Sequence, residues 1–577
     1  MNKAAVYHRV DSEYCYLLDE RTLVLRLRCA KGDLKSVSVV YGNRFDRAQP
    51  AVRHTVKMEK ICQGLYHDYY EVTLQPGFRR VFYYFELEES GAGGASGGGA
   101  SVAGSKYYYY QGAVRRDLPE NWYAFFQLPY MRREEVYNVP AWAEDAVMYQ
   151  IFPDSFATGH RFHDKSSKSA DWEGFTLTSK LGGNLRGIIE NIDYLVELGI
   201  NVLYLNPVFV AHSYHKYDTI DYKHIDPDFG TDEEFRELVK MLHKNGIRVV
   251  LDGVFNHTGR RFFAYQDILK NQEKSPYRDW YYDMPLPLLP DCKSDYACFA
   301  YVKAMPKLNT GNPEVCRYFC EVGKYWIEKY DIDGWRLDVA NEIDKNFWRE
   351  YKKAIRSVKK DAIMLAEVWE DAQNWQVYDQ FDSAMNYRFV NLCRDFFAGR
   401  TITAEEFGET FNESLMRYPH PVSYAQMNLL DSHDVSRFIS LCGEKPELLK
   451  LAVVVQMTLP GMPAIFAGDE RAMQGISEDE YRRAFVWDDD GKDCDYVACC
   501  PGDMTAFYKE LIALRRSHKV LRCGSVNFID TGNDEVLCYE RAAEEEKITI
   551  WVNNSDREWT EPKSGQTIKP FDYKIVV

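Results

Sequence analysis

Apolar positions follow two different periods along the chain. Between about residues 147 and 466, short apolar runs alternate with longer segments in which apolar residues recur every three or four positions. Short apolar runs bounded by polar residues predict buried parallel strands, and the longer period predicts amphipathic helices. We predict strands at 147–151, 202–205, 248–251, 334–337, 363–366, 381–383, 426–429 and 464–466.

The helical period is clearest at 232–243 and 314–326. Eight strand–helix units in succession predict a closed (β/α)8 barrel, that is, a TIM barrel of the α/β class. The connection after the third strand, residues 258–308, is too long for a simple loop and is rich in Pro, Asp and Tyr. Such a connection predicts an inserted subdomain over the mouth of the barrel.

The first 121 residues show the two-residue alternation of half-buried strands. This alternation is visible at 23–28, 37–41 and 69–74, and it predicts an N-terminal β-sandwich. The aromatic runs at 80–87 and 106–111 predict a hairpin with the Gly-rich segment 90–105 at its flexible tip. A linker between two domains is the alternative interpretation of that segment.

After a predicted helix at 507–516, strand patterns return at 536–540 and 548–552. They predict a short C-terminal β-domain. The predicted domains are therefore 1–121, then 122–521 with the insertion 258–308, and finally 522–577.

The composition narrows the choice of partners and of compartment. The formal net charge of −16 over 577 residues argues against nucleic acid and anionic membranes as partners and suits a neutral substrate. The N-terminus has no apolar signal-peptide core, and no run reaches the roughly 18 apolar residues of a membrane span. The 14 cysteines are scattered without zinc-type spacing, which is typical of reduced thiols in the cytoplasm.

Four of the short apolar runs end in residues that can carry chemistry. In a barrel of this class, the active site lies at the carboxyl ends of the strands. A single Asp at a strand end is more often a helix cap, but four such segments in one order on successive strands favour a functional site. The segments are Asp252-Gly-Val-Phe-Asn-His257, Gly334-Trp-Arg-Leu-Asp338, Ala366-Glu-Val-Trp369 and Leu430-Asp-Ser-His-Asp434.

Three acids among them, Asp338, Glu367 and Asp434, suffice for a retaining glycosidase, which needs a nucleophilic carboxylate and a protonated acid about 5–5.5 Å apart. We expect the guanidinium of Arg336 to lower the pKa of Asp338 and to keep it ionised as the nucleophile. Glu367 lies between an apolar strand and Trp369, and a partly buried acid of this kind suits general acid catalysis. Asp434 would then support the positive charge that develops on the sugar.

The four segments resemble the ordered motifs of the α-amylase family of glycoside hydrolases. Two details resemble the neopullulanase, cyclomaltodextrinase and maltogenic amylase subgroup: the second segment continues to Asn341-Glu342, and Met305-Pro-Lys-Leu-Asn309 precedes it. The resemblance covers nearly the whole chain, and the N-terminal β-stretch is similar to the starch-binding-type module of this subgroup. Further family-like segments are Tyr149-Gln-Ile-Phe-Pro153, His215-Lys-Tyr-Asp-Thr219 and Gly461-Met-Pro-Ala-Ile-Phe-Ala-Gly-Asp-Glu470.

The resemblance implies a role for each candidate site residue. Asp338 is the implied nucleophile, Glu367 the acid/base and Asp434 the transition-state stabiliser. The subgroup usually has Asp and Arg late in the barrel, and this chain departs from that pattern with Glu478 and Arg482. The other implied substrate-binding residues are Arg336, His257 and His433 around the reacting sugar, Tyr217 stacked on it, and Glu342 and Trp369 on the acceptor side.

Members of the family often bind calcium in a loop rich in Asn and Asp after the first strand. The corresponding loop here, residues 157–165, offers one carboxylate, whereas calcium needs several oxygen ligands. We therefore expect no metal and no other cofactor. The aspartates of the insertion leave a site open there: Asp279, Asp283, Asp291 and Asp295.

The resemblance implies hydrolysis of α-1,4-glucosidic bonds in cyclodextrins, malto-oligosaccharides and pullulan, with some transglycosylation. Two alternatives remain: an exo-acting α-glucosidase or α-1,6-preferring enzyme, and, in another class, an inactive sugar-binding barrel protein. The resemblance also implies a cytoplasmic homodimer in which the N-terminal module covers the partner's active site. A monomer whose module only binds starch is the alternative to the dimer.

Overall fold

The computed structural model describes residues 1–46, 52–90, 105–159, 180–290, 292–489, 491, 494–562 and 565–577. The chain divides into two compact units. The first contains Met1–Asn138, Ile402–Ser423 and Asn527–Leu537, and the second contains Val139–Thr401, Tyr424–Val526 and Cys538–Val577.

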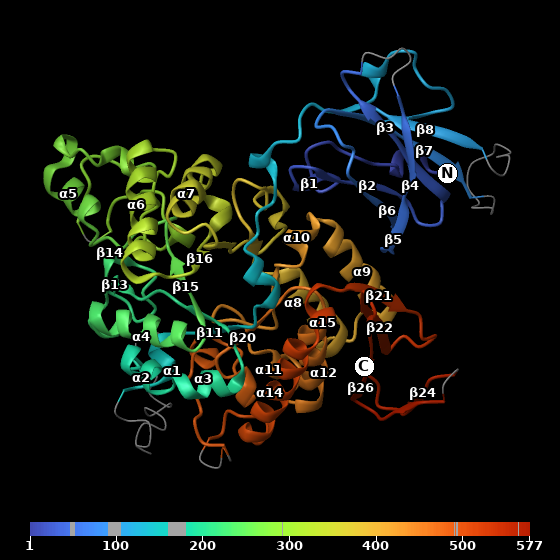
Figure 1. The fold of residues 1–577 in the computed structure, drawn as a ribbon. Helices are drawn as coiled ribbons and strands as arrows, with labels where there is room; N and C mark the ends of the chain where they lie inside the picture. Colours follow the sequence, from blue (N-terminus) through green and yellow to red (C-terminus); the bar gives the residue numbers. More distant parts are fainter. Residues whose placement is uncertain are drawn as a thin grey trace. The chain divides into compact units, whose positions relative to one another are not determined.

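Eight parallel strands form the centre of the second unit (Figure 1). They are hydrogen-bonded in the order β18-β17-β16-β15-β12-β11-β20-β19. A parallel bridge between Met385 and Met427 joins the two ends of this order, and the backbone N–H of Asn386 donates to the Met427 carbonyl at 2.8 Å. The predicted TIM barrel is therefore confirmed. Its strands are β11 (Met148–Ile151), β12 (Val202–Leu205), β15 (Arg248–Gly253), β16 (Gly334–Leu337), β17 (Ile363–Ala366), β18 (Ser383–Ala384), β19 (Met427–Leu429) and β20 (Met462–Phe466).

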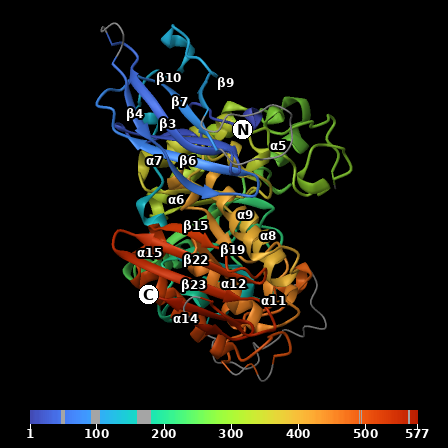
Figure 2. The same ribbon diagram turned by 90° about the vertical axis from the view of Figure 1, so that its right-hand side faces the viewer.

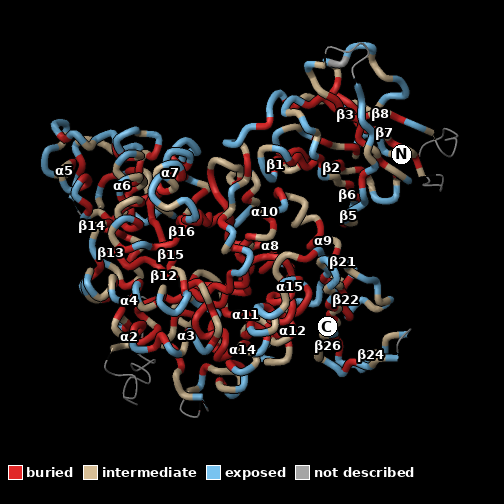
Figure 3. Tube along the Cα trace, viewed as in Figure 1, coloured by how far each residue is buried: buried red, intermediate tan, exposed pale blue. Residues whose placement is uncertain are grey.

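The barrel strands are mostly apolar because both of their faces are covered. Figure 3 shows the strands as buried, with the exposed residues on the surrounding helices and loops. All four residues of β11, β12, β16 and β17 are buried. This double coverage explains why the strands appear in the sequence as continuous apolar runs rather than as alternating patterns.

The helices begin at residues that cap them. α4 (Asp232–Lys244) starts with a capping box in which Thr231 and Glu234 each accept the other's backbone N–H. α6 (Pro313–Tyr330) follows an Asn312 cap, and α7 (Lys345–Val358) follows an Asp344 cap. α4 buries one stripe at helical spacing, namely Phe235, Leu238, Val239 and Leu242.

The long connection after β15 contains the helix α5 (Phe263–Asn271) and three short 3-10 helices, Gln272–Lys274, Arg278–Trp280 and Phe299–Tyr301. Isolated bridges tie this segment back to its own ends, between His257 and Lys307 and between Tyr281 and Leu308. The insertion therefore returns to the barrel next to the point where it leaves.

The N-terminal part of the first unit is a sandwich of two antiparallel sheets. The first has the order β1-β2-β6-β5, and the second has the order β4-β3-β7-β8-β9 with β10 beside β7. One apolar core joins the inner faces of both sheets, with Leu25 and Leu27 on one side and Val39 and Phe85 on the other. The strands are β1 (Cys15–Asp19), β2 (Thr22–Ala30), β3 (Leu34–Asn43), β4 (His54–Lys57), β5 (Glu59–Gln63), β6 (His67–Leu74), β7 (Val81–Glu89), β8 (Lys106–Tyr110), β9 (Ala113–Arg115) and β10 (Phe126–Leu128).

The strands on either side of the Gly-rich segment pair with each other. β7 and β8 are antiparallel neighbours, with Phe85 opposite Tyr109 and Glu88 opposite Lys106. The segment therefore connects two strands of one sheet, as the hairpin interpretation requires, and does not link two domains. Residues 91–104 themselves lie outside the described part of the chain.

The first unit also contains a helix that is distant in the sequence, α9 (Ala404–Met416). The buried Arg26 of β2 ion-pairs with Glu71 at 2.8 Å and donates to the carbonyls of Met416 (3.0 Å) and Tyr418 (3.3 Å). Burial of a guanidinium is stable when all of its donors are satisfied in this way. The sandwich is therefore built together with residues 402–423.

The C-terminal strands form a four-stranded sheet in the order β21-β22-β23-β26. Figure 2 shows β22 and β23 of this sheet together with α15 (Lys519–Cys523). In the described part of the chain, no helix is long and apolar enough to cross a membrane. All 14 cysteines are described, and none forms a disulfide. The strands are β21 (Ser525–Ile529), β22 (Val536–Ala543), β23 (Glu546–Asn553) and β26 (Asp572–Val576).

Candidate active site

A cavity of about 590 Å³ opens at the carboxyl ends of the barrel strands. Asp338 directly follows β16 and Glu367 directly follows β17, so the barrel itself places these two side chains. Arg336 and His433, two of the eleven predicted site residues, are fully buried and lie outside the cavity lining. The other nine line the cavity: Tyr217, His257, Asp338, Glu342, Glu367, Trp369, Asp434, Glu478 and Arg482.

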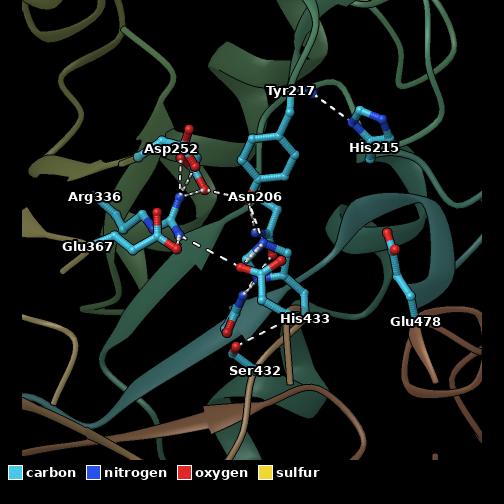
Figure 4. Close-up of polar contacts among 12 residues, drawn as sticks. Asn206, His215, Tyr217, Asp252, Arg336, Glu367, Ser432, His433 and Glu478 are labelled. Carbon is cyan, nitrogen blue, oxygen red and sulfur yellow. Dashed lines mark hydrogen bonds and ion pairs between the residues drawn. The ribbon is translucent and has the colours of Figure 1, made fainter. Parts of the chain in front are cut away.

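The guanidinium of Arg336 is the centre of the site. Its Nη1 contacts Asp252 and Asp338, each at 2.9 Å. Its Nη2 contacts Glu367 at 2.9 Å and Asp434 at 3.9 Å. Figure 4 shows Arg336 between Asp252 and Glu367. One buried cation thus faces four carboxylates that come from four different strand ends.

Asp252 was quoted in a motif of the sequence but was not among the predicted site residues. It is buried, and it accepts hydrogen bonds from the hydroxyls of Tyr204 (2.6 Å) and Tyr217 (3.1 Å). Asp252, held in this way, accepts from Nη1 of Arg336 with both of its oxygens, at 2.9 and 3.0 Å. The signal for Asp252 was its place at the end of β15, one strand before Asp338.

The pKa of Asp338 is shifted in the direction opposite to our expectation. Burial and the neighbouring Glu367 carboxylate raise the pKa of Asp338 well above its usual value, and the charge of Arg336 offsets only part of this effect. One guanidinium cannot neutralise several buried carboxylates, so the ionised form of Asp338 is disfavoured. The sequence shows that Arg336 is adjacent, but it does not show how many acids share it.

The two oxygens of Asp338 have different surroundings. Oδ1 accepts a hydrogen bond from Arg336 at 2.9 Å, whereas Oδ2 is buried and has no hydrogen-bond partner among the described residues. A buried carboxylate oxygen normally has a partner. Because Asp338 lines the cavity, Oδ2 is the oxygen available to a bound substrate.

Glu367 is held by donors on both oxygens. The backbone N–H of Val339 donates to Oε2 at 2.8 Å, and the indole N–H of Trp369 donates to Oε1 at 3.0 Å. Val339 has a left-handed backbone conformation (φ 45°, ψ 46°), which is rare and strained for a β-branched residue. Val339 directly follows Asp338, and its backbone N–H orients Glu367. Trp369 therefore contacts Glu367 through its polar N–H.

Asp434 is held by His433 and by two guanidinium groups. His433 Nε2 lies 2.9 Å from Asp434 Oδ2, and Arg482 Nη2 lies 3.3 Å from Oδ1. Burial alone would raise the pKa of Asp434, but His433, Arg336 and Arg482 together hold that pKa well below its usual value. Asp434 is therefore the acid of the cluster that remains ionised.

His433 lies beneath the cavity, and its ring nitrogens are occupied. Nδ1 accepts from the amide of Gln150 at 2.8 Å, and Nε2 contacts the Tyr217 hydroxyl at 2.5 Å. The Tyr217 ring is parallel to the His433 ring, with centroids 5.6 Å apart. Figure 4 shows Tyr217 above Asn206, whose amide donates to the Tyr217 hydroxyl at 3.0 Å. His433 therefore positions Asp434 and Tyr217.

His257 keeps a free ring nitrogen in the cavity. Burial lowers its pKa to about 3, so the imidazole is neutral at ordinary pH. Its Nε2 is buried and has no hydrogen-bond partner among the described residues, and its ring stacks on Phe299 with centroids 4.9 Å apart. A neutral imidazole of this kind can bind a sugar hydroxyl.

The remaining predicted residues lie at the rim of the cavity. The Trp369 ring is half exposed and stacks on Tyr387 with centroids 4.6 Å apart. Glu342 ion-pairs with Lys307 at 2.6 Å, and Lys307 also donates to the side chain of Asn256. Lys307 was quoted within a motif, but it was not predicted to contact Glu342.

Glu478 and Arg482, the two predicted residues that follow the last barrel strand, form an ion pair with each other four positions apart. Glu478 stands apart from the central cluster in Figure 4, and its side chain is 42% exposed. Arg482 is buried and also donates to the Tyr214 hydroxyl at 2.8 Å and to the His433 carbonyl at 2.9 Å. Arg482 therefore connects the rim to Asp434.

The sequence that builds this site matches the models of a known protein family. The family model of the alpha amylase catalytic domain matches residues 150–498, and that of the alpha amylase N-terminal Ig-like domain matches residues 1–132. The chain belongs to the α-amylase family. The family match spans all eight barrel strands except the first two residues of β11.

Similar proteins place the chain within this family. A cyclomaltodextrinase of Thermoanaerobacter pseudethanolicus is 41% identical over 568 residues, which cover 97% of this chain and 93% of the relative. An intracellular maltogenic amylase of Bacillus subtilis is 35% identical over 561 residues, covering 96% and 91%. A solved cyclomaltodextrinase structure has a TM-score of 0.87 at 36% identity, covering 97% and 92%. The chain is a member of the predicted neopullulanase, cyclomaltodextrinase and maltogenic amylase subgroup.

The calcium ion that many family members bind has no cluster of ligands among the described residues. No group of three or more His, Cys, Asp or Glu side chains that could ligate a metal occurs in the described ranges. Most of the loop considered in the sequence lies outside them, since residues 160–179 are not described, and neither is Asp291. The buried ammonium of Lys216 contacts Asp226 (3.0 Å) and Asp228 (2.7 Å), and Lys180 contacts Asp228 at 2.5 Å, so two lysines pair with these two carboxylates.

Replacing Asp338 by Asn should stabilise the folded protein. Below the unfolded pKa near 4, Asp338 is protonated in both states. As pH rises above it, the unfolded chain releases a proton that the folded site retains, so wild-type stability falls. The gain in stability of Asp338→Asn over wild type should therefore be small at pH 4 and should grow towards pH 7. Thermal melts of both proteins across this pH range measure it.

Asp382 provides the matched control for this measurement. It is equally buried, but two cations surround it, Lys352 and Arg356, each at 2.8 Å. Asp382→Asn should lower the melting temperature, because it leaves the buried Lys352 and the partly buried Arg356 without their carboxylate. A loss of stability on Asp338→Asn as large as that of Asp382→Asn would contradict the proposed sharing of one cation among several acids.

Removal of calcium should leave the melting temperature unchanged. Among the described acids outside the catalytic cluster, Asp226 and Asp228 pair with Lys216, and Asp295 pairs with Lys303. Differential scanning fluorimetry with and without EDTA tests this expectation. A melting temperature that falls with EDTA and recovers on addition of calcium would reveal a metal site.

Proposed function

We propose that this protein is a retaining glycoside hydrolase that cleaves α-1,4-glucosidic bonds in cyclodextrins and malto-oligosaccharides. The observation that carries the proposal is the cluster of Asp338, Glu367 and Asp434 around one buried guanidinium, in a cavity at the carboxyl ends of the strands. The names of the similar proteins, cyclomaltodextrinase and maltogenic amylase, support the same substrate class.

In the proposed first step, the free oxygen of Asp338 attacks the anomeric carbon while Glu367 donates a proton to the departing glycosidic oxygen. The C1–O bond breaks, and a glycosyl ester with Asp338 forms. This step needs a proton on Glu367 and a negative charge on Asp338. Arg336 contacts both carboxyls, so it stabilises that charge distribution directly.

In the second step, Glu367 accepts a proton from water, and the resulting hydroxide equivalent releases the sugar from Asp338. Both transition states have oxocarbenium character. The ionised Asp434 supports this positive charge, and the neutral imidazole of His257 offers its free Nε2 to a sugar hydroxyl. When a second sugar replaces water, the same step becomes transglycosylation.

The rim is proposed to bind the acceptor part of the substrate. The half-exposed ring of Trp369 is already fixed by Tyr387, so it can stack on a sugar without losing further side-chain freedom. Glu342 is fixed by Lys307. The proposal extends to pullulan as a substrate. An inactive sugar-binding barrel is the weaker reading, because all three acids face the cavity.

We further propose that the protein is a cytoplasmic homodimer with domains bounded near residues 121 and 521 and an insertion at 258–308. The 14 free cysteines are consistent with a reducing compartment. In a dimer, the aromatic-rich sandwich of one copy would narrow the entrance to the cavity of the other copy for large branched glucans. Short or cyclic glucans would then be favoured over starch.

Substitution of the two reacting carboxyls should affect different steps. Asp338→Asn should lower kcat/KM for β-cyclodextrin by roughly three orders of magnitude or more, because no covalent intermediate can form. Glu367→Gln should be equally poor on β-cyclodextrin but should retain the first step on α-maltosyl fluoride, whose leaving group needs no proton. Initial rates of sugar and fluoride release measure both effects.

Glu350→Gln is the matched control, since Glu350 is exposed on α7 and outside the cavity lining. It should leave both activities within about twofold of wild type, as is usual for a surface change. Turnover of β-cyclodextrin by Asp338→Asn at a rate near that of wild type would refute the mechanism.

The dimer can be tested on the intact protein. Size-exclusion chromatography with light scattering should give twice the 67.2 kDa mass of one chain. The intact chain is the correct sample, because the sandwich shares Arg26 contacts with Met416 and Tyr418, which removal of residues 1–120 would break. A single-chain mass at micromolar concentration, combined with a preference for starch over β-cyclodextrin, would reject the dimer and the proposed selectivity together.

A further inference from the structure

The insertion presents one aromatic side chain that serves no purpose within the fold. Tyr301 is 95% exposed, the highest value among the exposed large apolar side chains of the described residues. It makes no hydrogen bond, ion pair or ring contact with any other described residue. Burial of tyrosine stabilises a fold, whereas its exposure contributes nothing. The ring of Tyr301 is therefore fully open to a ligand from solvent.

Tyr301 is located at the edge of the active-site cavity. Its sequence neighbour Val302 lines the cavity, and so does Phe299, two residues before it. Consecutive Cα atoms are about 3.8 Å apart, so the backbone of Tyr301 cannot lie far from the cavity lining. Phe299 and Val302 line the cavity, whereas the side chain of Tyr301 is exposed to solvent. The Tyr301 ring therefore lies beyond the rim of the cavity.

The backbone at this position is held in an unfavourable conformation. Ala300 (φ 43°) and Tyr301 (φ 67°) are both left-handed, although neither is glycine. Residues other than glycine rarely adopt this backbone conformation. Two of them in succession persist only when the surroundings impose it. Strain of this kind is concentrated at ligand-binding and active sites.

Several contacts of the loop itself impose that conformation. Val302 N–H donates to the Phe299 carbonyl at 2.7 Å, and Met305 N–H donates to the Val302 carbonyl at 2.9 Å. Phe299 N–H in turn donates to the Met305 carbonyl at 3.0 Å, and the Phe299 ring stacks on His257. The loop is therefore fixed to the catalytic cavity, and it presents Tyr301 at a constant position.

We propose that Tyr301 is an aromatic platform of a glucan-binding subsite outside the catalytic cavity. Its ligand is a glucosyl unit of a linear α-1,4-glucan that is too long for the cavity of about 590 Å³. The apolar face of the sugar stacks on the exposed ring, and the rigid loop lowers the entropy lost on binding. The proposal rests on the proposed hydrolysis of malto-oligosaccharides and adds chain-length selectivity to it.

The test compares two linear substrates of different length in the full-length protein. Maltotriose is held by the cavity, whereas maltoheptaose extends past the rim. Tyr301→Ala should raise the KM ratio of maltoheptaose to maltotriose by roughly 2- to 12-fold, the range expected for one aromatic contact. Tyr301→Phe keeps the ring and should keep the wild-type ratio. Because kcat reports on the reacting groups, it should change little for either substrate.

Leu289→Ala is the control variant, since Leu289 is an exposed apolar residue of the same insertion that does not line the cavity. Its KM ratio should equal that of wild type. An unchanged ratio in Tyr301→Ala, with active wild-type enzyme, would overturn the subsite. A change in the mass of Tyr301→Ala by light scattering would also overturn it, because Tyr301 would then belong to an interface between two copies. Failure of wild-type protein to hydrolyse either sugar would instead refute the proposed function.

Discussion

The guanidinium of Arg336 lies fully buried where four barrel strands end, and it contacts Asp252, Asp338, Glu367 and Asp434. A single cation cannot balance four carboxylates in a medium of low polarity. The imbalance determines the chemistry of the site: Asp434 stays ionised, because His433 and Arg482 add to Arg336. Asp338 has less compensation, and its pKa is raised. The same shortage of positive charge therefore gives Asp338 and Asp434 opposite pKa shifts.

This arrangement opposes the stability of the fold. At Asp382 the chain surrounds one buried carboxylate with Lys352, Arg356 and a backbone N–H, which is the arrangement expected of a structural acid. At Asp338 one carboxylate oxygen has no partner, and the following residue, Val339, has a strained backbone. Natural active sites often sacrifice stability in this way. The contrast between two equally buried aspartates distinguishes a functional acid from a structural one without reference to any relative.

The sequence predicted those parts of the fold and site that follow from periodicity and order. Eight apolar runs predicted eight barrel strands, and residues placed at their ends, such as Asp338 and Glu367, were brought into one cavity by the barrel. Properties that depend on the number of neighbours could not be predicted. The pKa of Asp338 depends on four acids sharing one cation. The depth of His433 depends on Gln150 of β11 and on Tyr217, which lies outside the strands. Likewise, only the structure shows that residues 402–423 pack with the N-terminal sandwich.

The same distinction separates the reacting centre from the residues proposed to select the substrate. Asp338 and Glu367 directly follow strands, so the barrel fixes them, and chains with the same strand-end residues should share the same reaction. Trp369, Glu342, Glu478 and Tyr301 lie in the connections between barrel strands, and their positions depend on local contacts such as the Tyr387 stack or the hydrogen bonds of residues 299–305. Loop length and loop sequence can change without disturbing the barrel. Preferences among cyclic, short and long glucans should therefore change more readily than the bond-breaking chemistry. The strained, exposed loop around Tyr301 is a place where such a change would cost the barrel nothing.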